Sequence, residues 1–167
     1  MYNSFVIIIS VFFSLQTYVW AQESNDLGTY GDWQATFWNE GGGICTMMTI
    51  PKKSEGKYTK RGEVYAQVVK SMGTKDTGVV NFAAGYTFKE NSEVNIKIDD
   101  KHSFILFTNK STAWTQTEKD DASLIKFMKL GNTMIVKGIS SRGTNTKDTY
   151  SLKGFVAAYK AINKKCK

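Results

Sequence analysis

Residues 133–166 have the sequence TMIVKGISSRGTNTKDTYSLKGFVAAYKAINKKC, and this segment decides the predicted fold. Its start, Thr133–Ser140, is rich in β-branched residues, which predicts a strand. The next part, Ser141–Asp148, combines glycine, asparagine and serine and is typical of a turn. Residues 149–152 predict a second, short extended stretch. The segment therefore predicts a strand, a turn and a strand before the final helix.

The chain is predicted to close with a helix over residues 155–166. Phe155, Tyr159, Ile162 and Cys166 recur at the spacing of one helical face. We expect that face to pack inward, because its members form an apolar stripe. Cys166 then points to the interior, where another cysteine can reach it.

The amino terminus has the pattern of a secretory signal peptide. Residues 5–13, FVIIISVFF, form an apolar core of the right length, and Val19 and Ala21 occupy the small-residue positions before a cleavage site. Residues 1–21 are therefore predicted to be a signal peptide. An uncleaved membrane anchor is the alternative, disfavoured because the apolar run is shorter than the roughly 20 residues that span a bilayer. Residues 22–29 are predicted to be a flexible leader and residues 30–167 a single domain.

The chain contains two cysteines, Cys45 and Cys166. In an exported protein such a pair predicts a disulfide bond, which here would close most of the domain. Two buried free thiols are the alternative. A zinc site needs about four ligands, and the two cysteines with the single His102 do not supply them. No metal site is therefore predicted.

Between these ends the sequence alternates strand-like segments with polar turns. Trp33, Ala35 and Phe37 share one parity, as in a half-buried strand. Residues 117–131 break this rhythm and predict a helix with Asp120 or Asp121 at its N-cap. The whole chain is predicted to be mainly β, with about eight short strands, one inserted helix and a C-terminal helix, and the strand spacing favours a β-sandwich over a barrel. The strands outside the closing segment are predicted at residues 30–37, 44–50, 63–70, 79–88, 94–98 and 102–108.

The chain carries a formal charge of +7, from 22 Lys and Arg against 15 Asp and Glu. A basic surface suits anionic partners such as lipopolysaccharide, acidic lipid, acidic protein or nucleic acid. A merely solvated basic surface is the alternative, because the lysines are scattered along the chain. Nucleic acid is not predicted as a partner, since the protein is expected to be exported and most aromatic residues fall on the core parity.

The sequence shows no pattern of catalytic residues. The single His102 is predicted to lie in a strand, and the acidic pairs Asp99/Asp100 and Asp120/Asp121 fit a turn and a helix N-terminus. No nucleophile, zinc-protease or calcium-loop motif occurs. We therefore predict a non-enzymatic protein with no catalytic residues and no cofactor.

Several motifs lie between Tyr30 and Cys166. They are Gly31-Asp32-Trp33, Cys45, Lys60-Arg61-Gly62, Gly85-Tyr86 and residues 140–152, SSRGTNTKDTYSL. With the late cysteine in a terminal helix, they resemble the invasion-associated locus B family of Gram-negative bacteria. The resemblance implies an immunoglobulin-like β-sandwich and an exported protein that is periplasmic, associated with the outer membrane, or secreted. It also implies no known catalytic activity and no cofactor.

The SRGTNTKD turn supplies the candidate site residues Arg142, Thr144, Thr146 and Asp148. Arg142 and Asp148 lie on either side of a glycine turn, so they are predicted to face each other. One interpretation is an ion pair or hydrogen-bond network that holds the turn. The other is a polar recognition loop, since loops often carry binding residues.

The predicted function is a binding or interaction module of the periplasm or outer membrane, including a role in host-cell invasion and peripheral association with the outer membrane. Its partner would be a protein or another envelope or host-surface component. A structural envelope protein without a ligand and an envelope hydrolase are the alternatives.

Overall fold

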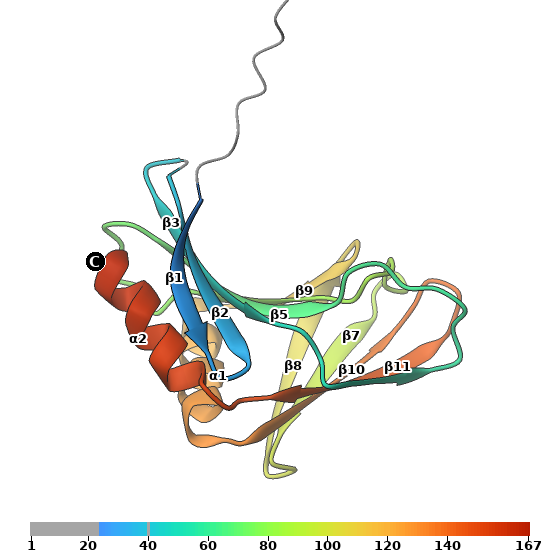
Figure 1. Ribbon diagram of the computed structural model, residues 1–167. Helices are drawn as coiled ribbons and strands as arrows, with labels where there is room; N and C mark the ends of the chain where they lie inside the picture. Colours follow the sequence, from blue (N-terminus) through green and yellow to red (C-terminus); the bar gives the residue numbers. More distant parts are fainter. Residues whose placement is uncertain (1–23, 40) are drawn as a thin grey trace, which may run out of the picture.

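Figure 1 shows the computed structural model, which describes residues 24–39 and 41–167. The predicted signal peptide, residues 1–21, lies outside the described residues. Within the described part the chain forms eleven strands and two helices, α1 (Glu118–Leu130) and α2 (Phe155–Lys165). The strands are β1 (Ser24–Tyr30), β2 (Trp33–Trp38), β3 (Ile44–Thr49), β4 (Lys53–Gly56), β5 (Tyr65–Ser71), β6 (Val79–Ala83), β7 (Glu93–Ile98), β8 (His102–Asn109), β9 (Thr112–Trp114), β10 (Thr133–Ile139) and β11 (Asn145–Ser151).

All eleven strands belong to one antiparallel sheet with the order β1-β2-β3-β5-β6-β9-β8-β7-β10-β11-β4. The sheet is strongly curved (Figure 1), so that strands far apart in this order face each other across the core. Phe82 of β6 and Tyr150 of β11, for example, have ring centroids 6.4 Å apart. The mainly β class with an inserted and a C-terminal helix is confirmed. The β-sandwich is not confirmed, because the strands form one hydrogen-bonded sheet, and there are eleven strands rather than about eight.

The inner face of the sheet follows the predicted alternation. Trp33, Ala35 and Phe37 of β2 are buried, whereas the residues between them are at least partly exposed. The predicted hairpin of β7 and β8 also forms, and Ile96 of β7 lies opposite Phe104 of β8. Alternation is a reliable signal here because one face of the sheet packs on the core and the other meets solvent.

Three strands that the sequence analysis does not predict are β1, β4 and β9. The segment predicted to be a flexible leader is mostly strand, since residues 24–30 form β1 and pair with β2. Both β1 and β4 are sheet edges and have mainly polar side chains, so neither shows an apolar alternation. The predicted turn at residues 141–148 is shorter than expected, because β11 already starts at Asn145. Backbone pairing places these polar strands in the sheet, and Leu27 and Tyr30 of β1 also pack against the core.

The two helices form at the predicted positions. Thr117 is the N-cap of α1, and its hydroxyl oxygen accepts the backbone N–H of Asp120. The prediction of Asp120 or Asp121 as N-cap is therefore wrong. Asp121 instead accepts the N–H of Val80 at 2.7 Å and so ties α1 to β6, and burial raises the pKa of its carboxyl. None of the described helices is long and apolar enough to cross a membrane.

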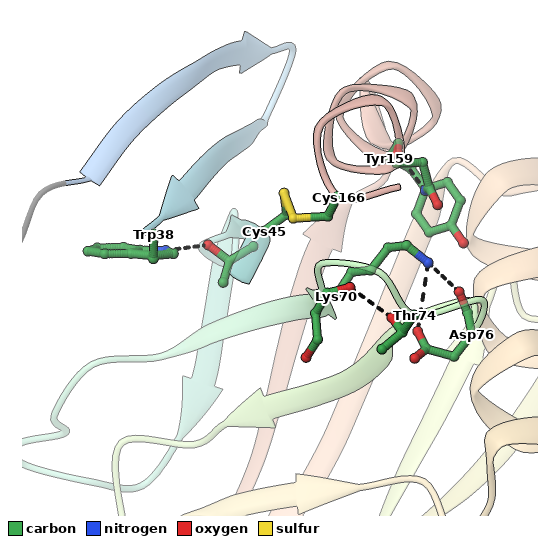
Figure 2. The surroundings of a disulfide bond; sticks show 10 residues. Trp38, Cys45, Lys70, Thr74, Asp76, Tyr159 and Cys166 are labelled. Carbon is green, nitrogen blue, oxygen red and sulfur yellow. Dashed lines mark hydrogen bonds and ion pairs between the residues drawn. A yellow bond between two sulfur atoms is a disulfide. The ribbon is translucent and has the colours of Figure 1, made fainter. Parts of the chain in front are cut away.

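Helix α2 packs on β1, β2 and β3 and is bonded to β3 by the disulfide between Cys45 and Cys166 (Figure 2). Both cysteines are fully buried, with their Cα atoms 6.0 Å apart, which confirms the predicted pairing. The predicted stripe of Phe155, Tyr159 and Ile162 is buried as well. The Tyr159 hydroxyl also donates to the Thr77 carbonyl at 2.7 Å. The helix thus holds the loop after β5 as well as the sheet.

Loss of the disulfide is expected to destabilise the protein strongly. The bond joins residues 121 positions apart, and closing a loop near that length is worth about 4–5 kcal/mol in the chain-entropy model. The double variant Cys45→Ala/Cys166→Ala should lose about that free energy of unfolding in urea titrations followed by circular dichroism. Wild-type protein reduced with dithiothreitol is the control and should lose a similar amount. A loss of unfolding free energy below about 1 kcal/mol in both samples would mean that the disulfide does not stabilise the fold.

Candidate functional site

The structure contains a groove of about 630 Å³. The segments that line it lie at the end of the sheet that is remote from α2 (Figure 1). Three segments that are distant in the sequence line it. They are the β4–β5 loop at residues 57–62, residues 86–87 after β6, and residues 140–142, 144 and 146 of the β10–β11 turn and β11.

The lining of this groove is polar and basic. Eight of its thirteen residues carry a hydroxyl group, four are lysine or arginine, and the other is a glycine. No carboxylate is among them. The groove therefore offers hydrogen-bond donors and positive charge, which is the chemistry that binds anions.

The floor of the groove rests on a buried ion pair between Arg61 and Asp148. Two guanidinium nitrogens donate to the two carboxylate oxygens at 2.8 Å each, and both side chains are 5% exposed. Arg61 also donates to the carbonyl of Ala84 at 2.6 and 3.0 Å. Burial alone would lower the pKa of Arg61, but the hydrogen bonds and charge of Asp148 outweigh it, so the pKa is raised. Arg61 is therefore charged, and it donates four hydrogen bonds inside the protein.

Two tyrosines flank this guanidinium. The rings of Tyr58 and Tyr86 each lie with their centroid 5.1 Å from the central carbon of Arg61, in cation–π geometry. The hydroxyl groups of Tyr86 and Thr146 are 2.6 Å apart and hydrogen-bonded. Burial raises the pKa of Tyr86, so this phenol stays protonated at neutral pH. Thr146, a predicted recognition residue, is buried and bonded to its neighbours.

A close approach of Gly62 and Gly85 holds the β4–β5 loop against the segment after β6. The N–H of Gly62 donates to the carbonyl of Gly85 at 2.8 Å. Gly85 has φ +68°, and a Cβ there would lie 2.6 Å from the Gly62 carbonyl oxygen. Only glycine allows this conformation at this distance. The loop is thus fixed where the backbones of Gly62 and Gly85 meet.

The β10–β11 turn is held by Ser140 and not by the predicted pair of Arg142 and Asp148. The N–H of Gly143 donates to the Ser140 carbonyl at 2.8 Å, and the N–H of Thr144 donates to its hydroxyl oxygen at 3.1 Å. Asp148 points inward from β11 to Arg61, whereas Arg142 is exposed at the turn. The prediction that Arg142 and Asp148 face each other is therefore wrong. Of the candidate residues, Arg142 and Thr144 line the groove as accessible groups.

Two exposed cations of the groove, Lys57 and Lys60, are not among the predicted site residues. A signal for them exists, because residues 51–62 contain five lysines and arginines among twelve residues. The segment lacks apolar alternation and was interpreted as a polar connection only. Its position over the groove follows from Arg61, whose partner Asp148 is 87 residues away.

The other titratable groups considered in the sequence lie elsewhere. His102 is exposed at the start of β8 and stacks on Phe127, with ring centroids 3.9 Å apart. Asp99 accepts the backbone N–H groups of Asn132 and Thr133, and these hydrogen bonds, that of Thr133 first, lower its pKa. Among the described residues, no three side chains of His, Cys, Asp or Glu are grouped to hold a metal ion.

A family model for the invasion associated locus B (IalB) protein matches residues 33–163. The chain belongs to the invasion-associated locus B family. The resemblance inferred from the motifs is thereby confirmed. No curated protein and no solved structure is significantly similar to the chain.

In this member of the invasion-associated locus B family, the motifs lie at two places in the fold. Lys60-Arg61-Gly62, Gly85-Tyr86 and the SSRGTNTKD segment surround the groove. The Gly31-Asp32-Trp33 motif lies at the other end, where the N–H of Asp32 donates to the Lys153 carbonyl at 3.0 Å. The indole N–H of Trp33 donates to the carbonyl of Ser151 at 3.1 Å. The motifs thus fix the two ends of β11 to the rest of the sheet.

Removing one partner of the buried ion pair is expected to destabilise the fold. Arg61→Met should cost about 3–5 kcal/mol of unfolding free energy, because it leaves the charge of Asp148 buried without a partner. The double variant Arg61→Met/Asp148→Leu should recover part of that loss. Chemical denaturation measures both values.

The matched control is Lys147→Gln, which removes a surface pair with Glu55 whose side chains are 43% and 37% exposed. It should cost at most about 1 kcal/mol. If Arg61→Met costs no more than this control, the ion pair does not hold the loop.

Proposed function

We propose that this protein is a non-enzymatic, exported binding module that holds an anionic group of an envelope or host-surface component in the groove. The single observation that carries the proposal is the lining of the groove, which consists of hydroxyl groups and cations without a carboxylate. The predicted signal peptide and the family membership support export to the periplasm, outer membrane or exterior. A role in host-cell invasion is part of this proposal.

Three cations of the groove are available to a ligand. Lys57, Lys60 and Arg142 are exposed and form no ion pair with the described residues. An isolated exposed lysine carries little information, because most are simply solvated. Here two lysines and an arginine surround one hollow, so their potentials add and attract an anion.

The groove favours binding over hydrolysis, the alternative activity. General acid–base catalysis uses mostly histidine or carboxylates, and glycoside hydrolysis uses a pair of carboxylates. Neither kind of residue is among those that line the groove. A structural envelope protein without a ligand remains the other alternative, and it has no need for unpaired cations around a groove.

Reversing charge in the groove is expected to abolish binding without unfolding the protein. Lys57→Glu/Arg142→Glu should lower co-sedimentation with outer-membrane vesicles of a Gram-negative bacterium by at least about tenfold, since each reversal replaces an attraction by a repulsion. The melting temperature should stay within about 2 °C, because neither side chain has an internal partner.

The matched control is Lys119→Glu/Lys160→Glu, which changes the net charge equally on the exposed faces of α1 and α2. This control should bind vesicles as the wild type does. An equal loss of binding in both double variants would mean that net charge alone drives the association, and the groove would lose its role.

A further inference from the structure

We propose that the ligand of this groove is an acidic polysaccharide, a linear chain of sugars with repeated carboxylate or phosphate groups, bound along a basic track that extends beyond the groove. The inference rests on the proposed function, because it names the ligand of the same site. Its argument comes from two neighbouring hollows, the charges along them and the chemistry of their walls.

The groove continues into two further hollows. The second, of about 730 Å³, is lined by residues 56–57 and 142–145, and the third, of about 360 Å³, by residues 55–56, 137–138 and 145–147. The groove and the second hollow share Lys57, Arg142 and Thr144. The second and third hollows share Gly56 and Asn145. The three hollows therefore adjoin one another, and together they are called the track. Because Lys137 and Lys147 project from the face of the hairpin opposite to Thr146, the track passes around the β10–β11 turn end of the sheet.

Positive charge extends along the whole track. Lys60 lies at the groove end, Lys57 and Arg142 lie in the shared middle, and Lys137 and Lys147 lie at the far end. Among the residues that line the three hollows the one carboxylate is that of Glu55, which is already paired with Lys53 at 2.9 Å and Lys147 at 3.2 Å. A small anion would occupy one hollow, whereas a chain of anionic units would contact lysine or arginine in all three hollows.

The walls of the track suit sugars better than a peptide. Hydroxyl and amide side chains both donate and accept hydrogen bonds, as sugar hydroxyls do. The three hollows contain no aliphatic side chain larger than the stems of lysine and arginine. A bound peptide is recognised through pockets for its alternating side chains, which are mostly apolar. The only large apolar surfaces in the track are the tyrosine rings of the groove, and Tyr58 is 37% exposed.

Titration calorimetry with sugars of defined length tests the inference on the intact mature protein. Octagalacturonate should bind at least about tenfold tighter than digalacturonate, because the longer chain reaches more cations at once. Neutral maltooctaose should show no measurable binding, and octaglutamate should bind at least about tenfold more weakly than octagalacturonate, since it lacks the sugar hydroxyls. The affinity for octagalacturonate should fall as salt is raised. A phosphorylated mannan oligosaccharide of similar length shows which acid the track prefers.

Variants at the two ends of the track separate a long ligand from a short one. Lys60→Gln and Lys137→Gln should each weaken octagalacturonate binding by about three- to tenfold, because one chain contacts both ends. Lys119→Gln on α1 is the matched control and should leave the affinity unchanged. An effect of Lys60→Gln alone would overturn the extended track.

The outcomes distinguish this inference from the proposed function. If digalacturonate binds as tightly as octagalacturonate, the groove binds a short anion and the proposal of a polysaccharide ligand is wrong. If octaglutamate binds with the same affinity as octagalacturonate, the track recognises charge alone and the proposal of a sugar ligand is wrong. If no acidic probe, neither saccharide nor peptide, binds at low salt, both the inference and the proposed anion-binding function are wrong.

Discussion

The buried ion pair between Arg61 and Asp148 is the interaction on which the groove depends. Both charges are removed from water, and such a pair is tolerated only where the geometry is good and the remaining donors are used. Here the bidentate contact and the two hydrogen bonds to the Ala84 carbonyl meet that condition. A pair of apolar side chains of similar volume would pack in the same space without fixing a direction. The guanidinium, in contrast, fixes the position of the β4–β5 loop relative to β11 and to the end of β6. The wall that carries Lys57 and Lys60 thereby has a defined place.

Strand β11 connects this polar end of the molecule to its apolar end. Its inward side chains change along the strand from Thr146 and Asp148 to Tyr150, followed by Leu152 after the strand ends. Thr146 lines the groove and Asp148 supports it through Arg61, whereas the apolar members belong to the hydrophobic core. The disulfide and α2 close the apolar end, so the sheet cannot open there. The curved sheet is therefore closed at one end by the disulfide and at the other by the ion pair of Arg61 and Asp148. Neither α1 nor α2 packs over the second end, and the groove lies there.

Local periodicity explains how much of this architecture was predictable. The alternation in β2 and the helical stripe that ends at Cys166 depend on neighbours in the sequence, and both are correct. The single curved sheet depends on the pairing order of distant strands, which no local pattern contains, so a two-sheet sandwich was expected instead. The same reason explains the wrong partner for Asp148. Arg142 is close in the sequence but lies at the exposed turn, whereas β-strand parity turns Asp148 inward to Arg61, 87 residues away. Lys57 and Lys60 are not predicted as site residues, because the many lysines of residues 51–62 do not show which surface this connection covers.

The motifs of the invasion-associated locus B family separate into residues that the fold needs and residues that it does not. Gly62 and Gly85 allow two backbones to meet, Arg61 and Asp148 form the ion pair, and Ser140 holds the turn. Each has a structural reason to be present. Lys60 and Arg142 belong to the same motifs, yet both side chains are exposed and neither has an ion-pair partner among the described residues. Stability offers no reason for a cation at either position, because exposed charges without partners contribute little. Both line one groove, so the part of the family pattern that folding leaves unexplained is the part that the proposed ligand would contact.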